Sequence, residues 1–330
     1  MTSILPGELP PPAPRDCFGR GELIEDVVSL AENLTPVALI GPGGIGKTHI
    51  ALKALHDHRI KQKFGDDRRF IRCDQFPASH AHFLSRLSDV IGAGAKNIEN
   101  LAPLRPFLSA GEMMIILDNV DLILDPQGTD AQQIYVMVEE LSQIGTISLF
   151  LTSRISTVPP GCKHLEVPTL SSDAACQIFY SIYDKDKWRH QIDNILEQLD
   201  FHPLSVTLLA AVAQHSKWDT DRLMREWKKQ RTSMLHTRHN KSLAAVVELS
   251  LASPMFRGLG PDARNLLGAV TFFSQGVYED NLDWLFPTIS NRARVFDDFC
   301  ILSVTFRSNG FITMLASGKR GLVYKPCLRT

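Results

Sequence analysis

Short apolar runs alternate with helix-length segments along the first half of the chain. Five runs have the length of a buried strand: "VALI" (37–40), "RFIRC" (69–73), "MMIIL" (113–117), "SLFLT" (148–152) and "HLEV" (164–167). Buried strands that are separated by helical segments are joined by right-handed crossovers and form a parallel sheet. The pattern therefore predicts an α/β fold, in which a five-stranded parallel sheet carries helices on both faces.

After residue 168 the strand pattern gives way to helical periodicity. Serines precede the apolar positions of "SSDAACQIFYSIY", and "QIDNILEQLDFHPLSVTLLAAVAQHS" is typical of two helices that meet at Pro203. A further helical unit begins near residue 241 and ends in two β-like runs around Ser308-Asn309-Gly310, as in a hairpin. Helices followed by a terminal hairpin indicate a small winged-helix domain.

These changes of pattern divide the chain into four parts. Residues 1–15 are rich in proline and predict an extended tether. Residues 16–168 carry the sheet, residues 169–240 form a helical domain, and residues 241–330 form a winged-helix-like domain. A chain of 330 residues is long enough for this number of domains.

Composition and charge exclude several classes of protein. Hydrophobic residues make up 44% of the chain and charged residues 22%, as in ordinary soluble globular proteins. The formal net charge of -1 gives no electrostatic reason to expect a nucleic acid or an anionic membrane as a partner. The six cysteines are scattered without a C-x-x-C pair, which favours reduced thiols over a disulfide framework or a zinc site.

The chain also lacks targeting signals that can be read from sequence. Its first residues have neither a basic region nor the apolar stretch of a signal peptide. No apolar run approaches the ~20 residues that span a bilayer. We therefore expect a cytoplasmic protein with no membrane partner.

The segment "GPGGIGKT", which begins at Gly41, fits two phosphate-binding motifs. Gly41, Gly43 and Gly46 match G-x-G-x-x-G, the dinucleotide-binding turn. Gly41, Gly46, Lys47 and Thr48 match G-x-x-x-x-G-K-[ST], the P-loop of nucleoside-triphosphate-binding proteins. Both motifs place a glycine turn before a helix N-terminus, where N–H groups and the helix dipole attract phosphate.

The lysine and the hydroxyl decide between the two motifs. A dinucleotide turn uses neither Lys47 nor Thr48, although Asp74, after the second predicted strand, could supply the acidic residue it requires. A triphosphate site uses both, because the lysine binds the β- and γ-phosphates and the hydroxyl ligates Mg²⁺. Asp118 ends the run "MMIIL" and places a carboxylate for the metal beside the loop. The motifs therefore predict ATP or ADP together with Mg²⁺, rather than a glycine turn that arose by chance.

The predicted site residues have three roles. Thr48 and Asp118 are expected to hold the metal, and Lys47, Asp118 and Arg154 are expected to act in catalysis. The residues expected to hold the nucleotide through the P-loop are Gly41, Pro42, Gly43, Gly44, Ile45, Gly46, Lys47, Thr48 and His49.

Further motifs, in the same order along the chain, resemble those of the fungal NOD-like receptors. These are signal-transduction (STAND) ATPases with an NB-ARC domain, related to the AAA+ proteins. The matching segments are "FGR" at 18–20, "LDNVDLILDP", "LFLTSR" ending at Arg154, "FHPLSVTLLAAVA", which is similar to the G-L-P-L-A motif around His202-Pro203-Leu204, and "VVELSLASP". The resemblance extends from residue 18 to about residue 316.

The resemblance implies a molecular switch that closes around ADP and opens when ATP replaces it. By this resemblance, Phe18, Gly19 and Arg20 hold adenine from the N-terminal side. Pro203 and Leu204 do so from the helical domain. Arg154 would sense the γ-phosphate, although its position alone also fits a solvated loop residue. The implied partners are other copies of the chain, or other proteins that assemble on activation.

Two positions depart from the family pattern. Asn119 follows the strand aspartate, where related ATPases often carry a second acid that orients water. Asp121 or Asp125 is an alternative source of that acid. Met314-Leu315-Ala316 stands where plant relatives have Met-His-Asp, so no histidine is present to contact the ADP phosphate. We therefore expect slow ATP hydrolysis.

Two other functions compete with the switch. "KWDTDRLMREWKKQR" (217–231) is basic and contains two tryptophans, which suits a nucleotide-gated DNA-binding regulator. The opposing interpretation is an amphipathic helix that buries Leu223 and Trp227 and leaves its charges in water, which the near-neutral net charge favours. A metabolic P-loop kinase is the weaker alternative, since the chain has no lid or acceptor-site motif.

Overall fold

The protein forms two compact units, Met1–Pro168 and Thr169–Thr330. The computed structural model describes residues 10–76, 78–124, 130–156, 158–184 and 189–233, together with two short strands at 315–316 and 322–323. In this described part of the chain, none of the helices has the length and apolar character that crossing a membrane requires.

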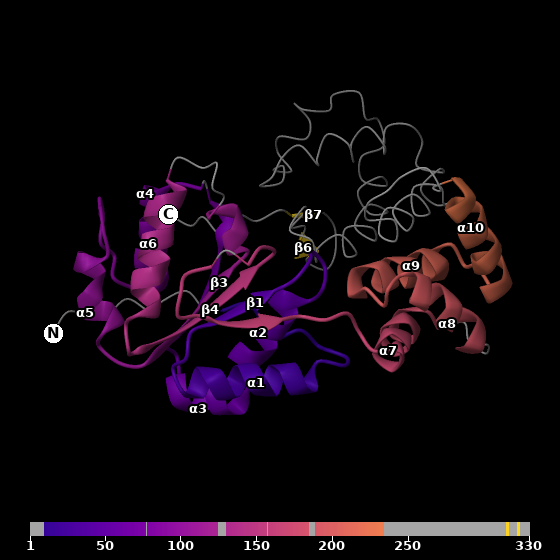
Figure 1. Ribbon diagram of the computed structural model, residues 1–330, viewed down its shortest axis with the longest axis horizontal. Coiled ribbons are helices and arrows are strands. Elements are labelled where there is room, and N and C mark those ends of the chain that lie inside the picture. Colours follow the sequence, from indigo (N-terminus) through magenta and orange to yellow (C-terminus); the bar gives the residue numbers. More distant parts are fainter. Residues whose placement is uncertain are drawn as a thin grey trace, which may run out of the picture. The chain divides into compact units, whose positions relative to one another are not determined.

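The first unit is built on a five-stranded sheet with the order β2-β3-β4-β1-β5, in which every neighbouring pair is parallel (Figure 1). The strands are β1 Val37–Ile40, β2 Arg68–Arg72, β3 Met113–Asp118, β4 Ile147–Ser153 and β5 Lys163–Glu166. Each predicted strand is present, with bounds that differ by at most one residue. The fifth was predicted to be buried, and this is wrong: β5 is an edge strand in which Lys163, His164 and Glu166 are exposed. The predicted parallel α/β sheet is therefore confirmed.

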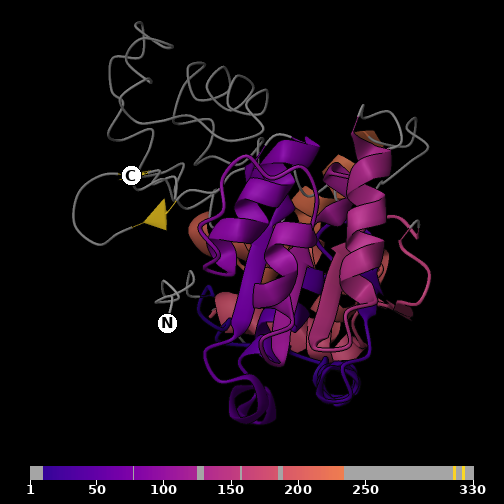
Figure 2. The same ribbon diagram turned by 90° about the vertical axis from the view of Figure 1, so that its left-hand side faces the viewer.

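Helices cover both faces of this sheet (Figure 2). The helices on one face are α1 Gly21–Glu32, α2 Lys47–Leu55 and α3 His58–Phe64, and those on the other are α4 His80–Val90, α5 Arg105–Leu108 and α6 Ala131–Ser142. Alternate residues of β3 enter two separate cores, with Met114 and Ile116 in the first and Ile115 and Leu117 in the second. Burial on both faces explains why Met113 to Leu117 of β3 form a continuous apolar run.

Short 3₁₀ turns extend the carboxyl ends of two strands. These turns are η1 Cys73–Gln75 after β2 and η3 Val120–Leu122 after β3, and a further turn, η2 Ala102–Leu104, precedes α5. The carboxyl ends of parallel strands lie at one edge of the sheet, where loops and ligand sites gather in open α/β folds. We call this side the carboxyl edge.

The strand order excludes the dinucleotide alternative. In a dinucleotide-binding fold the second strand lies beside the first. Here β3 and β4 separate β2 from β1, so Asp74, after β2, is displaced from the β1 loop by three strand spacings, or about 14 Å. Asp74 is also engaged by Arg72, whose Nε and Nη2 donate to its two carboxylate oxygens at 3.1 and 2.7 Å.

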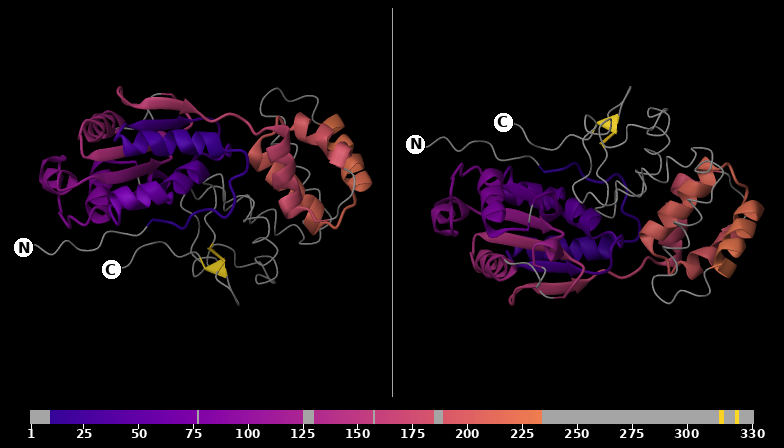
Figure 3. Two further views of the ribbon diagram at one scale, coloured as in Figure 1. Left: turned by 90° about the horizontal axis from the view of Figure 1, so that it is seen from below. Right: turned by 90° about the horizontal axis from the view of Figure 1, so that it is seen from above.

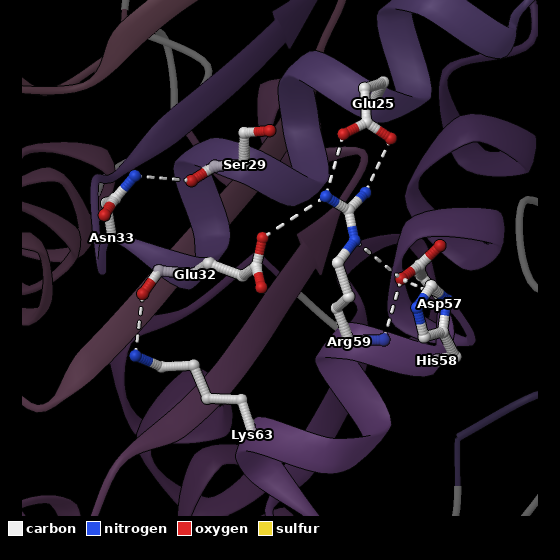
Figure 4. A network of polar contacts seen from close by, with 8 residues as sticks. All are labelled: Glu25, Ser29, Glu32, Asn33, Asp57, His58, Arg59 and Lys63. Carbon is white, nitrogen blue, oxygen red and sulfur yellow. Dashed lines mark hydrogen bonds and ion pairs between the residues drawn. The ribbon is translucent and has the colours of Figure 1, made fainter.

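A network of polar side chains joins α1 to α3 on the outside of the first unit (Figure 4). Arg59 of α3 donates to both carboxylate oxygens of Glu25 in α1, at 2.8 and 2.6 Å. Its Nε also donates to Asp57, the residue that caps α3, and Lys63 donates to the carbonyl of Glu32 at 2.7 Å. We call this the Arg59 network. The bidentate pairing of Arg59 with Glu25 fixes the orientation of α3 against α1.

The first described residues lie against the helix that follows the β1 loop. His56, which ends α2, places its Nε2 2.7 Å from the carbonyl oxygen of Pro11. Lys53 of α2 donates to the carbonyl of Arg15 at 3.1 Å. The described part of the proline-rich segment is therefore attached to α2.

The second unit is helical in its described residues up to 233, and Figure 3 shows these helices gathered in one cluster. They are α7 Ser172–Ile182, α8 Arg189–Gln198, α9 Pro203–His215 and α10 Thr220–Ser233. The hydroxyl of Ser171 caps α7 by accepting from the N–H of Ala174, as the serines in the sequence predict. Pro203 occupies the first position of α9, where its missing N–H costs no hydrogen bond.

The tryptophans of the basic segment belong to the core of this unit. Leu223 is fully buried, Trp227 is 3% exposed and Trp218 is 2% exposed. The indole N–H of Trp227 donates to Gln198 at 2.8 Å. The amphipathic interpretation of this segment is therefore confirmed, and its aromatic rings are not available to stack on nucleic-acid bases.

Several expectations fall outside the described residues. These are the winged-helix-like domain as a whole, the turn at residues 308–310, and Asp125. Within the last part of the chain, β6 Leu315–Ala316 pairs with β7 Leu322–Val323 in antiparallel fashion.

Candidate nucleotide site

The glycine loop connects β1 to α2 at the carboxyl edge. Its first amide, the N–H of Gly41, donates to the carbonyl of Ser153 at the end of β4, at 3.2 Å. Gly46 caps α2 with a φ of 103°, a conformation that side chains other than glycine adopt at a cost in strain. A Cβ at Gly41 would lie 3.3 Å from Ile45 and from the carbonyl of Val167. Both glycines are therefore required by this loop.

The glycine loop leads directly into the N-terminus of helix α2, which is exposed to a ligand bound in the loop. Helix α2 starts at Lys47, directly after the loop, and Ile45, 1% exposed, anchors the loop in the core. The first N–H groups of a helix have no partner within the helix, and the helix dipole adds partial positive charge. His49 lies on the first turn of α2 and is exposed. This end of α2 therefore suits a phosphate group.

Lys47 is a buried cation that contacts neutral groups. Its Nζ donates to the carbonyls of Gly41 at 2.7 Å and Pro42 at 3.0 Å, and the residue is 6% exposed. Burial lowers the pKa of Lys47 to about 8, while Asp121 and Asp118 act in the opposite direction. Carbonyls do not neutralise an ammonium group, so a phosphate anion here would balance a charge that burial makes costly.

Asp118 is a buried carboxylate that accepts from two hydroxyls. Thr48 donates to its Oδ1 at 2.8 Å and Thr152 donates to the same atom at 2.6 Å. Asp118 is 1% exposed. Burial raises its pKa, and the hydrogen bonds from Thr152 and Thr48 oppose that rise because they favour the ionised form. The structure thus brings together Thr48, which the P-loop motif predicted, and Asp118, which the apolar run before it predicted.

These two side chains fit a magnesium ion. Carboxylate and hydroxyl oxygens are the hard ligands that Mg²⁺ prefers, and the ion commonly takes one or two of them together with phosphate oxygens. Across the described ranges, no three His, Cys, Asp or Glu side chains are grouped so that they could hold a metal by themselves. Thr48 and Asp118 would therefore hold Mg²⁺ jointly with a bound nucleotide.

Thr152 is a site residue that the sequence did not single out. Leu151 of β4 pairs with Leu117 of β3, so the next residues, Thr152 and Asp118, lie side by side at the strand ends. Thr152 also accepts from the N–H of Asn119 at 2.9 Å, and Asn119 has the left-handed φ of 60° that asparagine tolerates. The sequence could have indicated this residue, because Thr152 is the polar residue that ends the apolar run "SLFLT".

Arg154 lies directly after β4 and contacts Asp121, which the sequence analysis gave as an alternative source of the acid that orients water. Its backbone N–H donates to Oδ1 of Asp121 at 3.2 Å, and its Nε lies 3.6 Å from Oδ2 of the same residue. The Arg154 side chain is 37% exposed and that of Asp121 is 10% exposed. Arg154 is therefore held at the carboxyl edge rather than fully solvated.

The segment before α1 contacts the P-loop itself. Arg20 is 5% exposed, and its Nη2 donates to the carbonyl of Ile45 at 3.2 Å. Burial lowers the pKa of Arg20. Phe18 is half-buried, and Gly19 has a left-handed φ of 64°. Arg20 thus supports the loop, while an adenine contact of this segment stays a prediction.

The remaining predicted residues belong to the second unit. Pro203 and Leu204 begin α9, and Leu204 is 2% exposed. His202 caps this helix, with its Nδ1 3.5 Å from the N–H of Ser205. Contacts of Pro203 and Leu204 with a nucleotide stay predictions.

The fold is similar to that of solved P-loop ATPases. A Walker-type ATPase of Pyrococcus abyssi matches with a TM-score of 0.52 at 14% identity, over 90% of this chain and 92% of that one. A STAND protein with a tetratricopeptide-repeat sensor, from Pyrococcus horikoshii, matches with a TM-score of 0.52 at 15% identity, over 90% of this chain. The match spans only 40% of the length of that STAND protein.

The likeness to known proteins is one of structure and not of sequence. No protein-family model matches the chain, and no curated protein matches it. At 14% and 15% identity, the structural likeness shows the fold alone. The first unit therefore has the fold of a P-loop ATPase.

Proposed function

We propose that this protein is an ATP- and ADP-binding signalling ATPase of the STAND type, with an NB-ARC domain like that of the fungal NOD-like receptors. The observation that carries the proposal is the cluster of Lys47, Thr48 and Asp118 at the carboxyl edge. These are a phosphate-binding ammonium, a metal-binding hydroxyl and a carboxylate. The hydroxyl and the carboxylate are joined at 2.8 Å although they lie 70 residues apart in sequence.

In this proposal the chain's own groups bind and orient the nucleotide. The N–H groups at the start of α2 and the Lys47 ammonium bind the phosphates, and Thr48 and Asp118 hold the metal. Mg²⁺, when bound, would supply positive charge against the phosphate oxygens. Thr152 holds Asp118 in place through its 2.6 Å hydrogen bond. Arg154 is proposed to sense the γ-phosphate.

The adenine contacts in this proposal come from the family resemblance. Phe18, Gly19 and Arg20 are proposed to contact the base from the N-terminal side. Pro203 and Leu204 are proposed to contact it from the helical domain. The contact of Arg20 with Ile45 is compatible with this role, since it links that segment to the phosphate-binding loop.

Hydrolysis is expected to be slow because Asn119 stands where an acid would orient water. An amide accepts a hydrogen bond from water but cannot take its proton. General-base assistance is worth about 10²–10⁴-fold, so its absence leaves turnover below the ~1 s⁻¹ of typical enzymes. Slow hydrolysis suits a switch, because a long-lived ATP state allows copies of the chain or partner proteins to assemble in the cytoplasm.

The experiment that tests the proposal compares assembly with two nucleotides. Light scattering after size exclusion is measured for the full chain with Mg²⁺ and either ADP or ATPγS. We expect a larger assembly with ATPγS only, and no response in Lys47→Ala. Lys53→Ala is the matched control, since it removes the same charge from the exposed part of the same helix. If the chain binds both nucleotides but elutes equally with ADP and with ATPγS, the switch is refuted and the nucleotide-binding site is retained.

The DNA-binding alternative is tested in parallel. It rests on the winged-helix-like domain, which lies outside the described residues, and on the basic segment whose tryptophans are buried. Binding of duplex DNA that weakens steeply with salt would favour this alternative, because phosphate contacts release counterions. We expect no such binding.

A further inference from the structure

Asp121 is paired with Arg154 at the carboxyl edge. It belongs to η3, and both of its carboxylate oxygens face Arg154: Oδ1 accepts from the backbone N–H at 3.2 Å, and Oδ2 lies 3.6 Å from Nε. Its side chain is 10% exposed, so water screens this pair less than it screens a surface ion pair. The guanidinium of Arg154 is therefore already engaged by an anion of the chain itself.

The pair is close to the phosphate-binding loop because of the strand order. β4 and β1 are neighbours, Ile40 pairs with Ser153, and the N–H of Gly41 donates to Ser153. The loop and Arg154 thus leave the sheet side by side. The charge of Asp121 is therefore held beside Arg154, next to the strand end from which the phosphate-binding loop begins.

We propose that Asp121 sets a preference of this site for a nucleoside diphosphate over a triphosphate, by holding Arg154 in competition with the outermost phosphate. A terminal phosphate that contacts Arg154 meets a guanidinium whose positive charge Asp121 already offsets in part. It must also approach a carboxylate of the same sign, and like charges brought together in a partly buried site repel strongly. A diphosphate lacks that phosphate and meets neither cost. Asp121 is thus a positioning residue that acts through Arg154.

The inference rests on the proposed function, because it assumes that nucleotides bind at the P-loop. It adds a residue outside the P-loop and metal-binding motifs, and it names what that residue distinguishes. Asn at position 121 would keep an oxygen that accepts from the N–H of Arg154 while removing the charge. Glu would keep the charge. The two substitutions therefore separate charge from loop geometry.

The test measures the affinity of the full chain for ADP and for ATPγS, with Mg²⁺, by calorimetry. We expect Asp121→Asn to bind ATPγS about tenfold more tightly, with ADP affinity within about twofold of the parent. Asp121→Glu should keep the parent's ratio of the two affinities. In an Arg154→Gln background the gain from Asp121→Asn should fall below about threefold, since the competition acts through Arg154.

Asp74→Asn is the matched control. Asp74 is also a largely buried carboxylate paired with an arginine after a neighbouring strand, and its η1 turn contacts η3. We expect it to leave the ratio of ADP to ATPγS affinity within about twofold of the parent. An unchanged or lower ATPγS affinity in folded Asp121→Asn would overturn the inference. Failure of the parent to bind either nucleotide would instead overturn the proposed function.

Discussion

The buried charges Lys47 and Asp118 at the carboxyl edge differ from the charges of the Arg59 network in the groups that they contact. In the network, the guanidinium of Arg59 meets the carboxylates of Glu25, Glu32 and Asp57, so opposite charges contact one another within the chain. At the edge, Lys47 meets carbonyls and Asp118 meets hydroxyls, which are neutral groups.

The difference separates a structural arrangement from a binding arrangement. A buried charge that is bound by neutral groups costs free energy of folding, because its charge is not offset by an opposite one. A charged ligand can recover that cost when it binds. An exposed, fully paired network has no such reserve, and its effect is to orient the helices that it joins.

The largest effect is expected from Lys47→Ala. The ammonium is placed for phosphate, and charge-assisted hydrogen bonds contribute about 1.5–3 kcal/mol each, so several lost contacts should abolish measurable ADP binding. The fold should survive, since the side chain is not part of either apolar core. Calorimetry with ADP, with circular dichroism as the check on folding, measures both. Parent-like ADP affinity in this variant would refute the P-loop assignment.

Asp118→Asn should lower Mg²⁺-dependent ATP turnover by about 100-fold and retain ADP. It should also raise the melting temperature of the nucleotide-free protein. Burial raises the pKa of Asp118 in the folded state, so its ionised form at neutral pH opposes folding, and the amide removes that opposition. Steady-state turnover and thermal unfolding are the measurements. Unchanged turnover would contradict the metal-binding role, and a lower melting temperature would show that the carboxylate stabilises the fold.

The strands and the centre of the site were predictable because their signals are local. Every residue of β3 and of β4 is buried, so these strands appear as mainly apolar runs whatever lies elsewhere in the chain. Gly46, Lys47 and Thr48 are adjacent in sequence, and the loop chemistry that they serve needs them at that spacing.

The rest of the site depends on contacts between distant segments. Thr152 reaches Asp118 across 34 residues, Arg154 reaches Asp121 across 33, and Arg20 reaches Ile45 across 25. Such contacts follow from the register of β3 on β4 and from the packing of α1 on α2. A single sequence specifies that these strands are buried but does not state how one is aligned on the next.

Asn119→Asp should raise the rate of ATP hydrolysis about tenfold or more, because an acid there can accept a proton from the attacking water. The left-handed backbone at this position tolerates aspartate, so the substitution should not disturb the turn. Single-turnover hydrolysis of the parent, Asn119→Asp and Asp121→Asn measures the effect. A parent turnover of several per second that Asp121→Asn abolishes would show that Asp121 orients the water and that Asn119 does not limit the rate.

The smallest effect is expected from Glu25→Gln, which removes one charge from the Arg59 network. Pairing with Arg59 lowers the pKa of Glu25 in the folded protein. A carboxylate whose folded pKa is lowered stabilises the protein above its unfolded pKa of about 4.3, and that contribution is lost as pH falls through the folded value. Because Glu25 is largely exposed, the contribution is small and screened by salt.

Unfolding by urea should therefore show a slightly less stable variant at pH 7 in low salt. The difference should disappear both in about 1 M salt and at pH values below the folded pKa of Glu25. ADP affinity should not change, because the charges of the network contact opposite charges of the chain on α1 and α3 and lie outside the predicted nucleotide site. A Glu25→Gln variant with weakened ADP binding would contradict this reasoning. It would mean that the orientation of α3 against α1 affects α2, the helix that follows the P-loop.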